Sequence, residues 1–249
     1  MQPEDLITLT PPVEQKERQP FWGYLDLLLL VGLLFASMTL VVLLAGAWAR
    51  FDPRIKNDLT SIALPLQLVV YALVYVCFFL LFKFRYNRPV LASLGWRKTN
   101  FSLLTAGLSG VLLAFGLSAI AQLIHTPKVD TAFDELVKTP ASLALLAVTA
   151  IVFAPLFEEM LFRGFLQPLL SRTLGTVSGV LITALLFGSL HASEYKFAWQ
   201  YVAAITLVGV ALGAVRAKTN SLIPGTVMHG CFNAVSIVGL IALKYATHK

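Results

Sequence analysis

The sequence predicts an all-α, polytopic transmembrane helical bundle of about seven spans, within a range of six to eight. Hydrophobic residues make up 57% of the chain and charged residues only 13%. The uncharged residues also form continuous runs about as long as the ~20 residues that a helix needs to cross a bilayer. These runs are Leu27–Ala49, Leu59–Phe82, Thr99–Pro127, Thr139–Phe157, Thr173–Ser193, Phe197–Val215 and Thr219–Leu243. Their continuity excludes a barrel, whose strands alternate in polarity over ~10 residues.

Three regions follow from this pattern. Residues 1–24 mix prolines with charges of both signs, which predicts a mobile cytoplasmic N-terminal tail. Residues 25–138 carry few polar groups inside their spans and are expected to be scaffold helices. Residues 139–249 hold the unusual polar residues and are expected to form the catalytic core. Trp22 and Trp48 flank the first span, as interfacial anchors do.

The basic residues lie between spans and not along one stripe, so the net charge of +6 does not indicate nucleic-acid binding. With the N-terminus inside, eleven of the nineteen Lys and Arg residues fall on the cytoplasmic side, a modest positive-inside bias. We therefore expect a multi-pass integral membrane protein with a cytoplasmic N-terminus, in a bacterial inner (plasma) membrane. Cys77 and Cys231 lie inside apolar runs and are interpreted as small core residues.

The fourth span is expected to start near Pro140 and to kink at Pro155, because proline removes a backbone hydrogen bond. Gly175 is the expected turn to the fifth span. Glu158 lies 17 residues before this glycine and His191 lies 16 residues after it. In an antiparallel hairpin both side chains then lie roughly 25 Å from the turn. We expect them to meet inside the membrane, in its cytoplasmic half.

Adjacent carboxylates interrupt this apolar region at Glu158 and Glu159. A charge inside a membrane helix costs about 2.5–3.5 kcal/mol and by default marks function. Glu159 and Arg163 are four residues apart and can pair on a helix, whereas Glu158 has no local partner. The pair alone could be purely structural, and the carboxylates could mark an ordinary interfacial helix end. The apolar residues that follow Glu159 argue against that second interpretation.

Two further pairs with four-residue spacing occur later in the chain. Phe187 precedes His191, and His229 precedes Asn233. A lone intramembrane histidine is more often a hydrogen-bonded core residue than a catalyst, and a lone asparagine more often links two helices. The occurrence of Glu158, His191, His229 and Asn233 on three predicted helices favours a functional site.

These three ordered motifs resemble those of the CPBP intramembrane proteases. That family includes the type II CAAX prenyl endopeptidases (the Ras-converting enzymes) and the bacterial Abi-type bacteriocin self-immunity proteins. The resemblance covers residues ~140–243 and extends to Phe162, Arg163 and Gly164, and to Arg216, Thr219, Ser221 and Leu222.

The resemblance implies an intramembrane endopeptidase that hydrolyses a peptide bond. Glu158 and His191 would activate water, and His229 and Asn233 would stabilise the oxyanion. Glu159 and Arg163 would support the site, as would Phe187. The family carries both a metalloprotease and a glutamate-protease label, so a zinc ion held by Glu158, His191 and His229 stays open. Chemistry without a cofactor is favoured, because Asn233 suits an oxyanion donor better than a zinc ligand.

The expected partners are the lipid bilayer and a membrane-associated peptide or protein substrate, prenylated or not. In bacteria that substrate could be a processed peptide and not a CAAX-type C-terminus. One alternative function is a non-catalytic bacteriocin-immunity or peptide-binding membrane protein, although a pure binder has no need of Glu158. The other is a small transporter with a proton relay, which the lack of matched repeats with broken helices disfavours.

Overall fold

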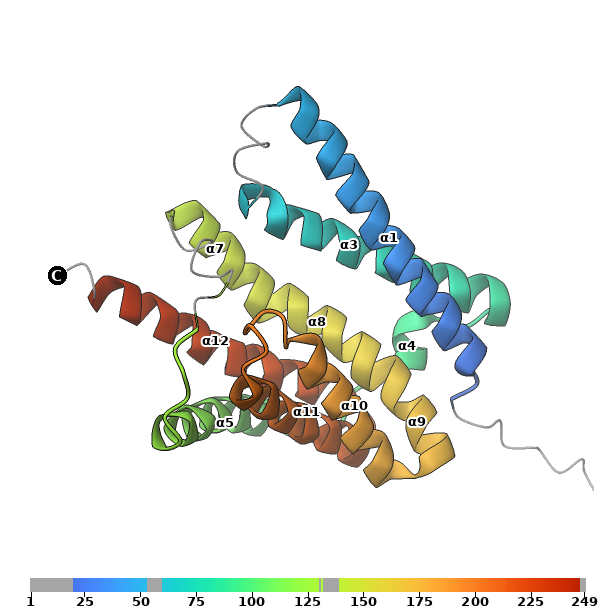
Figure 1. Cartoon of the computed structure of the whole chain (residues 1–249). Coiled ribbons are helices and arrows are strands. Elements are labelled where there is room, and N and C mark those ends of the chain that lie inside the picture. Colours follow the sequence, from blue (N-terminus) through green and yellow to red (C-terminus); the bar gives the residue numbers. More distant parts are fainter. Residues whose placement is uncertain (1–19, 53–59, 130, 132–138, 247–249) are drawn as a thin grey trace, which may run out of the picture.

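The computed structural model describes residues 20–52, 60–129, 131 and 139–246, and every regular element among them is helical (Figure 1). This confirms the predicted all-α class. Most of the predicted N-terminal tail lies outside the described residues. The elements are α1 (Tyr24–Phe51), α3 (Thr60–Leu80), η1 (Leu81–Arg85), α4 (Val90–Leu94), α5 (Leu103–Leu123), α7 (Pro140–Val148), η2 (Thr149–Phe153), α8 (Ala154–Glu158), η3 (Glu159–Leu166), α9 (Gln167–Leu174), α10 (Thr176–Leu190), α11 (Trp199–Thr219) and α12 (Ile223–Ala246).

Six helical stretches among the described residues are long and apolar enough to cross a membrane. They are Tyr24–Phe51, Ile62–Arg85, Leu103–Leu123, Pro140–Leu174, Trp199–Thr219 and Ile223–Ala242. The predicted fifth span is shorter than its uncharged run, because α10 has only 15 residues. Gly175, with φ at +84°, separates it from α9, and His191 caps its other end.

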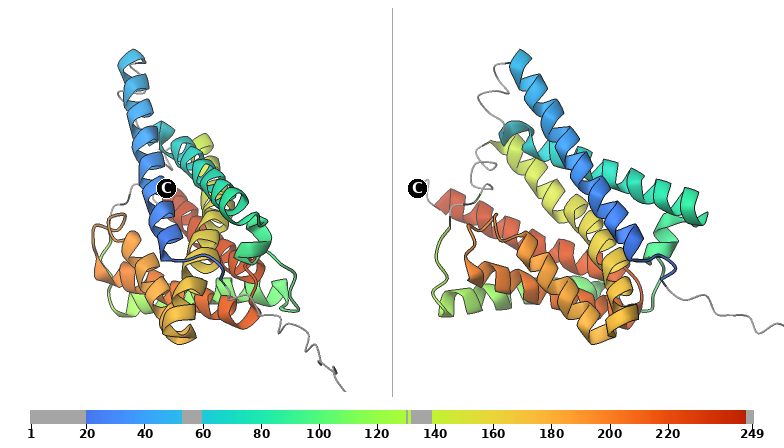
Figure 2. Two further views of the ribbon diagram at one scale, coloured as in Figure 1. Left: turned by 90° about the vertical axis from the view of Figure 1, so that its right-hand side faces the viewer. Right: turned by 45° about the vertical axis from the view of Figure 1, so that its right-hand side comes forward.

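The helices run between two ends of the bundle (Figures 1 and 2). We call one the Gly175 end; it contains residues 20–24, 86–102, 172–176 and 216–222. Hydrogen bonds join these segments, including Arg97 Nε to the Asn220 carbonyl oxygen at 2.7 Å and Ser221 Oγ to the Arg97 carbonyl oxygen at 2.6 Å. The opposite end, which we call the Glu194 end, contains the turn at 191–198.

An aromatic cluster holds the start of α1 to the long helix formed by α7 to α9. The Trp22 ring stacks on Phe165 with centroids 5.4 Å apart, and its Nε1–H donates to the Phe165 carbonyl oxygen. Phe78 and Phe82 pack against these rings. Trp22 is only 2% exposed, so the prediction of an interfacial anchor is wrong for this residue, because its indole finds a partner inside the core.

The helix from Pro140 to Leu174 is continuous but contains two π-helical segments, η2 and η3. Thr139 caps its start, since its Oγ1 accepts from the Ser142 amide. Pro155 is the second residue after η2, next to a wide turn that already interrupts the α-helical hydrogen bonds, so a proline is less costly there. The predicted break at Pro155 therefore takes the form of a widened turn.

Small residues allow the remaining helices to pack closely, as is common in membrane bundles. A Cβ atom added at Gly110 of α5 would lie 2.1 Å from the Met228 carbonyl oxygen of α12. A Cβ atom at Gly188 of α10 would lie 2.1 Å from Thr206 Oγ1 of α11. These contacts fix α10, α11 and α12, which carry the other polar residues, around the long helix.

Candidate active site

The two adjacent carboxylates have different surroundings. Glu159 Oε1 accepts from Arg163 Nη1 at 3.0 Å, and both side chains are almost fully buried. Arg163 Nη2 also donates to the Gly209 carbonyl oxygen of α11 at 3.2 Å. The predicted pair of Glu159 and Arg163 is thus present and is tied to a second helix. Glu158, one residue earlier on the helix, lines a cavity instead.

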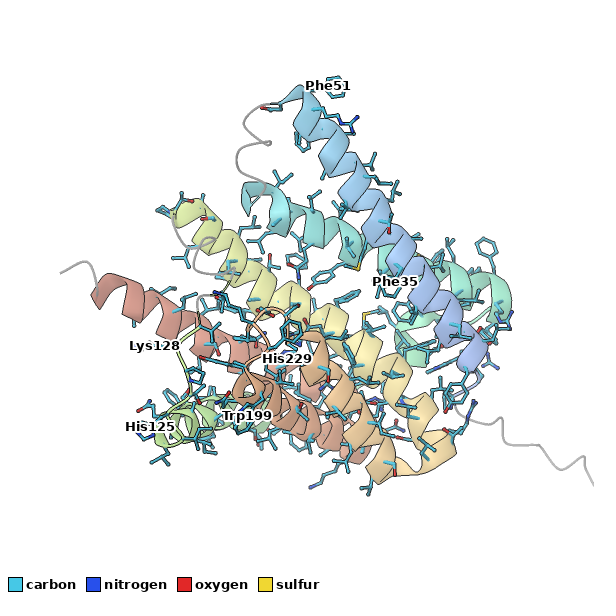
Figure 3. All side chains as sticks on the ribbon, viewed as in Figure 1. Phe35, Phe51, His125, Lys128, Trp199 and His229 are labelled. Atoms are coloured by element: carbon cyan, nitrogen blue, oxygen red, sulfur yellow. The ribbon has the colours of Figure 1, made fainter. Side chains whose placement is uncertain are left out.

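This cavity has a volume of about 350 Å³ and brings together the four predicted catalytic residues. Glu158 comes from α8, His191 from the C-terminus of α10, and His229 and Asn233 from α12. Figure 3 labels His229, which lies in the interior of the bundle. The polar residues of the three motifs therefore line one cavity, as their joint occurrence on three predicted helices had suggested.

His229 lies between the two carboxylates. Its Nδ1 is 3.2 Å from Glu159 Oε1, and its Nε2 is 3.6 Å from Glu158 Oε2. Because Glu159 is paired with Arg163 and can only accept, Nδ1–H is the donor in the first contact. The second contact is longer than a hydrogen bond. A proton on Nε2 or on Glu158 is needed here, since two lone pairs would otherwise face each other.

His191 is held by the element that it ends. Its Nδ1 lies 2.8 Å from the Phe187 carbonyl oxygen, which can only accept, so Nδ1 carries the proton and Nε2 is left as an acceptor. The Phe187 ring packs against His191 and His229, with centroids 4.8 and 5.8 Å apart. Arg163 lies over the same ring at 4.4 Å. The Phe187 ring thus contacts Arg163 and both imidazoles.

Asn233 is held by η2, the first π-helical segment of the long helix. Its Nδ2 donates to the Ala150 carbonyl oxygen of η2 at 2.7 Å. This bond uses one of the two amide N–H groups and fixes the orientation of the side chain, which leaves the second N–H for a ligand in the cavity.

The structure also places Glu194 in the cavity, a residue that the sequence analysis did not single out. It lies in the turn after α10, three residues beyond His191. Burial raises the pKa of the Glu194 carboxyl above its usual value; the nearby charge of His191 opposes this effect, and that of Glu158 adds to it. The three-residue spacing from His191 was the available sequence signal. Gln67 of the predicted scaffold region lines the cavity as well.

The cavity lies far from the Gly175 turn. Its lining includes Leu64 near the start of α3, Leu146 of α7 and Leu240 near the end of α12. Since His191 ends α10, the cavity lies toward the Glu194 end. The expectation of a site inside the membrane, in its cytoplasmic half, stays a prediction.

A zinc ion held by Glu158, His191 and His229 would require three converging ligand atoms. Within residues 20–52, 60–129, 131 and 139–246, no group of three or more His, Cys, Asp or Glu side chains is arranged to hold a metal ion. His229 Nε2 lies 3.6 Å from Glu158 Oε2, and its Nδ1 is bonded to Glu159, so two of the three expected ligands face each other. Whether the site holds a metal stays a prediction.

Residues 140–235 match the sequence model of a known family, described as type II CAAX prenyl endopeptidase Rce1-like. This stretch of the chain is similar to that family. This confirms the resemblance seen in the motifs, and all the predicted site residues fall within the matched range. No curated protein and no solved structure matches the chain.

The Rce1-like match supports intramembrane endopeptidase activity in general terms. Together with the six apolar helices, it identifies an integral membrane protein. The region before residue 140 lies outside the match. Its α3 nevertheless contributes Leu64 and Gln67 to the cavity, so the division between scaffold (25–138) and core (139–249) stays a prediction.

Proposed function

We propose that the chain is an intramembrane endopeptidase that uses Glu158 as its general base. The observation that carries this proposal is the contrast between two neighbouring carboxylates. Glu159 is sealed in an ion pair, whereas Glu158 lines a cavity with two histidines and an asparagine. A general base must have its carboxylate free to reach the water that it deprotonates, and only Glu158 of the two meets this condition.

In the proposed reaction, Glu158 and the free Nε2 of His191 hold one water molecule. The two side chains line the same cavity without a direct hydrogen bond between them, which leaves room for this water. The water oxygen attacks the peptide carbonyl carbon, and its proton passes to Glu158. The same proton then goes to the leaving amide nitrogen, the C–N bond breaks, and a carboxylate and an amine result.

Two side chains are placed to stabilise the tetrahedral oxyanion. Asn233 would offer its second amide N–H, and His229 would offer Nε2–H when protonated. In that form Nδ1–H would still donate to Glu159 while Nε2–H points to the substrate. One such donor lowers the barrier by about 3–4 kcal/mol. Glu159, Arg163 and Phe187 would act on the reaction only through the positions of these groups.

The proposed substrate is a membrane-associated peptide or protein, which the cavity would take as an extended segment. Prenylated CAAX-type ends and bacterial peptides both meet this description. The proposed setting is a bacterial inner membrane with the N-terminus in the cytoplasm, supported by the basic residues gathered at the Gly175 end.

The test compares wild type with Glu158→Gln in detergent, on quenched peptides with and without a prenyl group and with and without a strong chelator. A second variant, Glu194→Gln, removes a carboxylate from the same cavity and serves as the charge control. We expect cleavage that survives the chelator, is retained in Glu194→Gln and is lost in Glu158→Gln. Loss on chelation with recovery on added zinc would instead assign Glu158 and the histidines to a metal site. Binding without cleavage by wild type would overturn the proposal in favour of a peptide-binding protein.

A further inference from the structure

A second pocket lies at the Gly175 end, on the far side of the bundle from the cavity. Its volume is about 710 Å³, within the range of about 300–1,000 Å³ that small-molecule sites occupy. Four arginines line it: Arg88 and Arg97 beside α4, Arg172 of α9 and Arg216 of α11. Three segments far apart in the sequence thus bring four guanidinium groups to one place.

Backbone oxygens hold three of these arginines. Arg97 Nε donates to the Asn220 carbonyl oxygen, Arg172 Nη1 donates to the Pro20 carbonyl oxygen, and Arg216 Nε donates to the Arg163 carbonyl oxygen at 3.0 Å. Each of these bonds positions a side chain without neutralising it. The other N–H groups of Arg97 and Arg172 have no acceptor among the described residues.

None of the described residues that line the pocket is acidic. The described residues of the Gly175 end include no Asp or Glu; Asp26, just beyond it, already accepts from Arg85, Tyr86 and the Gly23 amide. The same end holds six basic residues: Arg88, Arg97, Lys98, Arg172, Arg216 and Lys218.

We propose that this pocket binds a phosphate-bearing anion. Guanidinium groups match phosphate oxygens in a bidentate geometry, and several converging forks favour a phosphate over a single carboxylate. Ser171 also lines the pocket and adds a hydroxyl donor, whereas the Ser93 hydroxyl already donates to the Pro89 carbonyl oxygen. The source is either the headgroup of an anionic phospholipid or a soluble phosphate compound. Basic pockets between transmembrane helices are known to take lipid headgroups. The proposal does not rest on the peptidase activity.

The test uses the full chain in detergent and two variants with the same charge loss at the same end. Arg97→Gln/Arg172→Gln changes two pocket residues, whereas Lys98→Gln/Lys218→Gln changes two exposed residues outside it. The probes are phosphatidylglycerol and phosphatidylcholine, read by native mass spectrometry, and glycerol phosphate, read by thermal stabilisation. We expect the anionic probe to bind wild type and the lysine variant alike, and to bind the arginine variant at least about ten-fold more weakly.

The probes distinguish the two sources. Retention of phosphatidylglycerol but not of glycerol phosphate assigns the pocket to a lipid headgroup, and the reverse assigns it to a soluble ligand. Equal binding to all three proteins, equal binding of phosphatidylcholine, or no binding of either anion would overturn the proposal. Because Arg172 also donates to the Pro20 carbonyl oxygen, Arg172→Gln could disturb the local fold. Arg172→Lys is a milder variant, since it keeps the positive charge and removes only the bidentate guanidinium geometry. We expect it to bind with intermediate affinity.

Discussion

Exchanging each of the two adjacent carboxylates for its amide tests which one does chemistry and which one holds the helices. In Glu159→Gln, Arg163 loses its only carboxylate partner while both side chains remain buried. Removing one member of a buried ion pair costs about 3–5 kcal/mol, because the other charge is left uncompensated. For a chain of this size, that corresponds to a melting temperature lower by about 6–20 °C.

Glu158→Gln should behave in the opposite way. Its nearest charged contact is His229 Nε2 at 3.6 Å, and its side chain is 17% exposed to the cavity. We expect a stability change of about 1 kcal/mol or less and a loss of cleavage by a factor of about 100 to 10,000, the typical contribution of a general base. Stability can be followed by thermal unfolding in detergent and activity by peptide cleavage.

A double variant provides the control for this prediction. Glu159→Gln combined with Arg163→Met removes both charges, and replacing a buried pair with uncharged side chains is often neutral or stabilising. The double variant should therefore recover much of the stability lost in Glu159→Gln. If Glu159→Gln melts like wild type, or if the double variant is less stable than the single one, the assignment of a structural role to this pair is wrong.

Three other predictions concern the same region. A Cβ atom at Gly225 would lie 3.1 Å from Glu159 Oε2. Because Glu159 positions His229, Gly225→Ala should lower the cleavage rate while the melting temperature changes little. An unchanged cleavage rate would contradict this placement. In Gly110→Ala the new methyl group would meet the Met228 carbonyl oxygen at 2.1 Å, and we expect destabilisation by about 1–3 kcal/mol in thermal unfolding, with wild-type stability as the refuting result. The raised pKa of Glu194 means that its proton stabilises the folded state and that this contribution disappears as the pH rises through the raised value. Relative to wild type, Glu194→Gln should therefore melt at similar temperatures near about pH 4 and at higher temperatures near about pH 8; a difference independent of pH would refute the assignment.

Local spacing predicted much of the site. The four-residue interval gave the pair of Glu159 and Arg163, and similar distances from Gly175 predicted that Glu158 and His191 would meet. The apolar runs predicted the helical class and most of the spans. These features depend on helix geometry alone, which the sequence encodes directly.

The features that were missed depend on contacts between helices. That His229 would lie between both carboxylates follows from the packing of α12 against the long helix, which no spacing reveals. Glu194 resembles an ordinary solvated turn residue until the fold brings that turn over the cavity. The π-helical segments were also unpredicted, because no simple residue pattern marks them.

The short α10 has a consequence for the surrounding lipid. Its 15 residues extend roughly 22 Å at 1.5 Å per residue, whereas a bilayer has a hydrocarbon core of about 30 Å. Backbone groups in the turn after His191 cannot face acyl chains without hydrogen-bond partners. We therefore expect hydrophobic mismatch at this edge, with a locally thinner, hydrated bilayer. Such a depression would carry water to Glu158 and let a substrate segment near the leaflet surface arrive without complete dehydration.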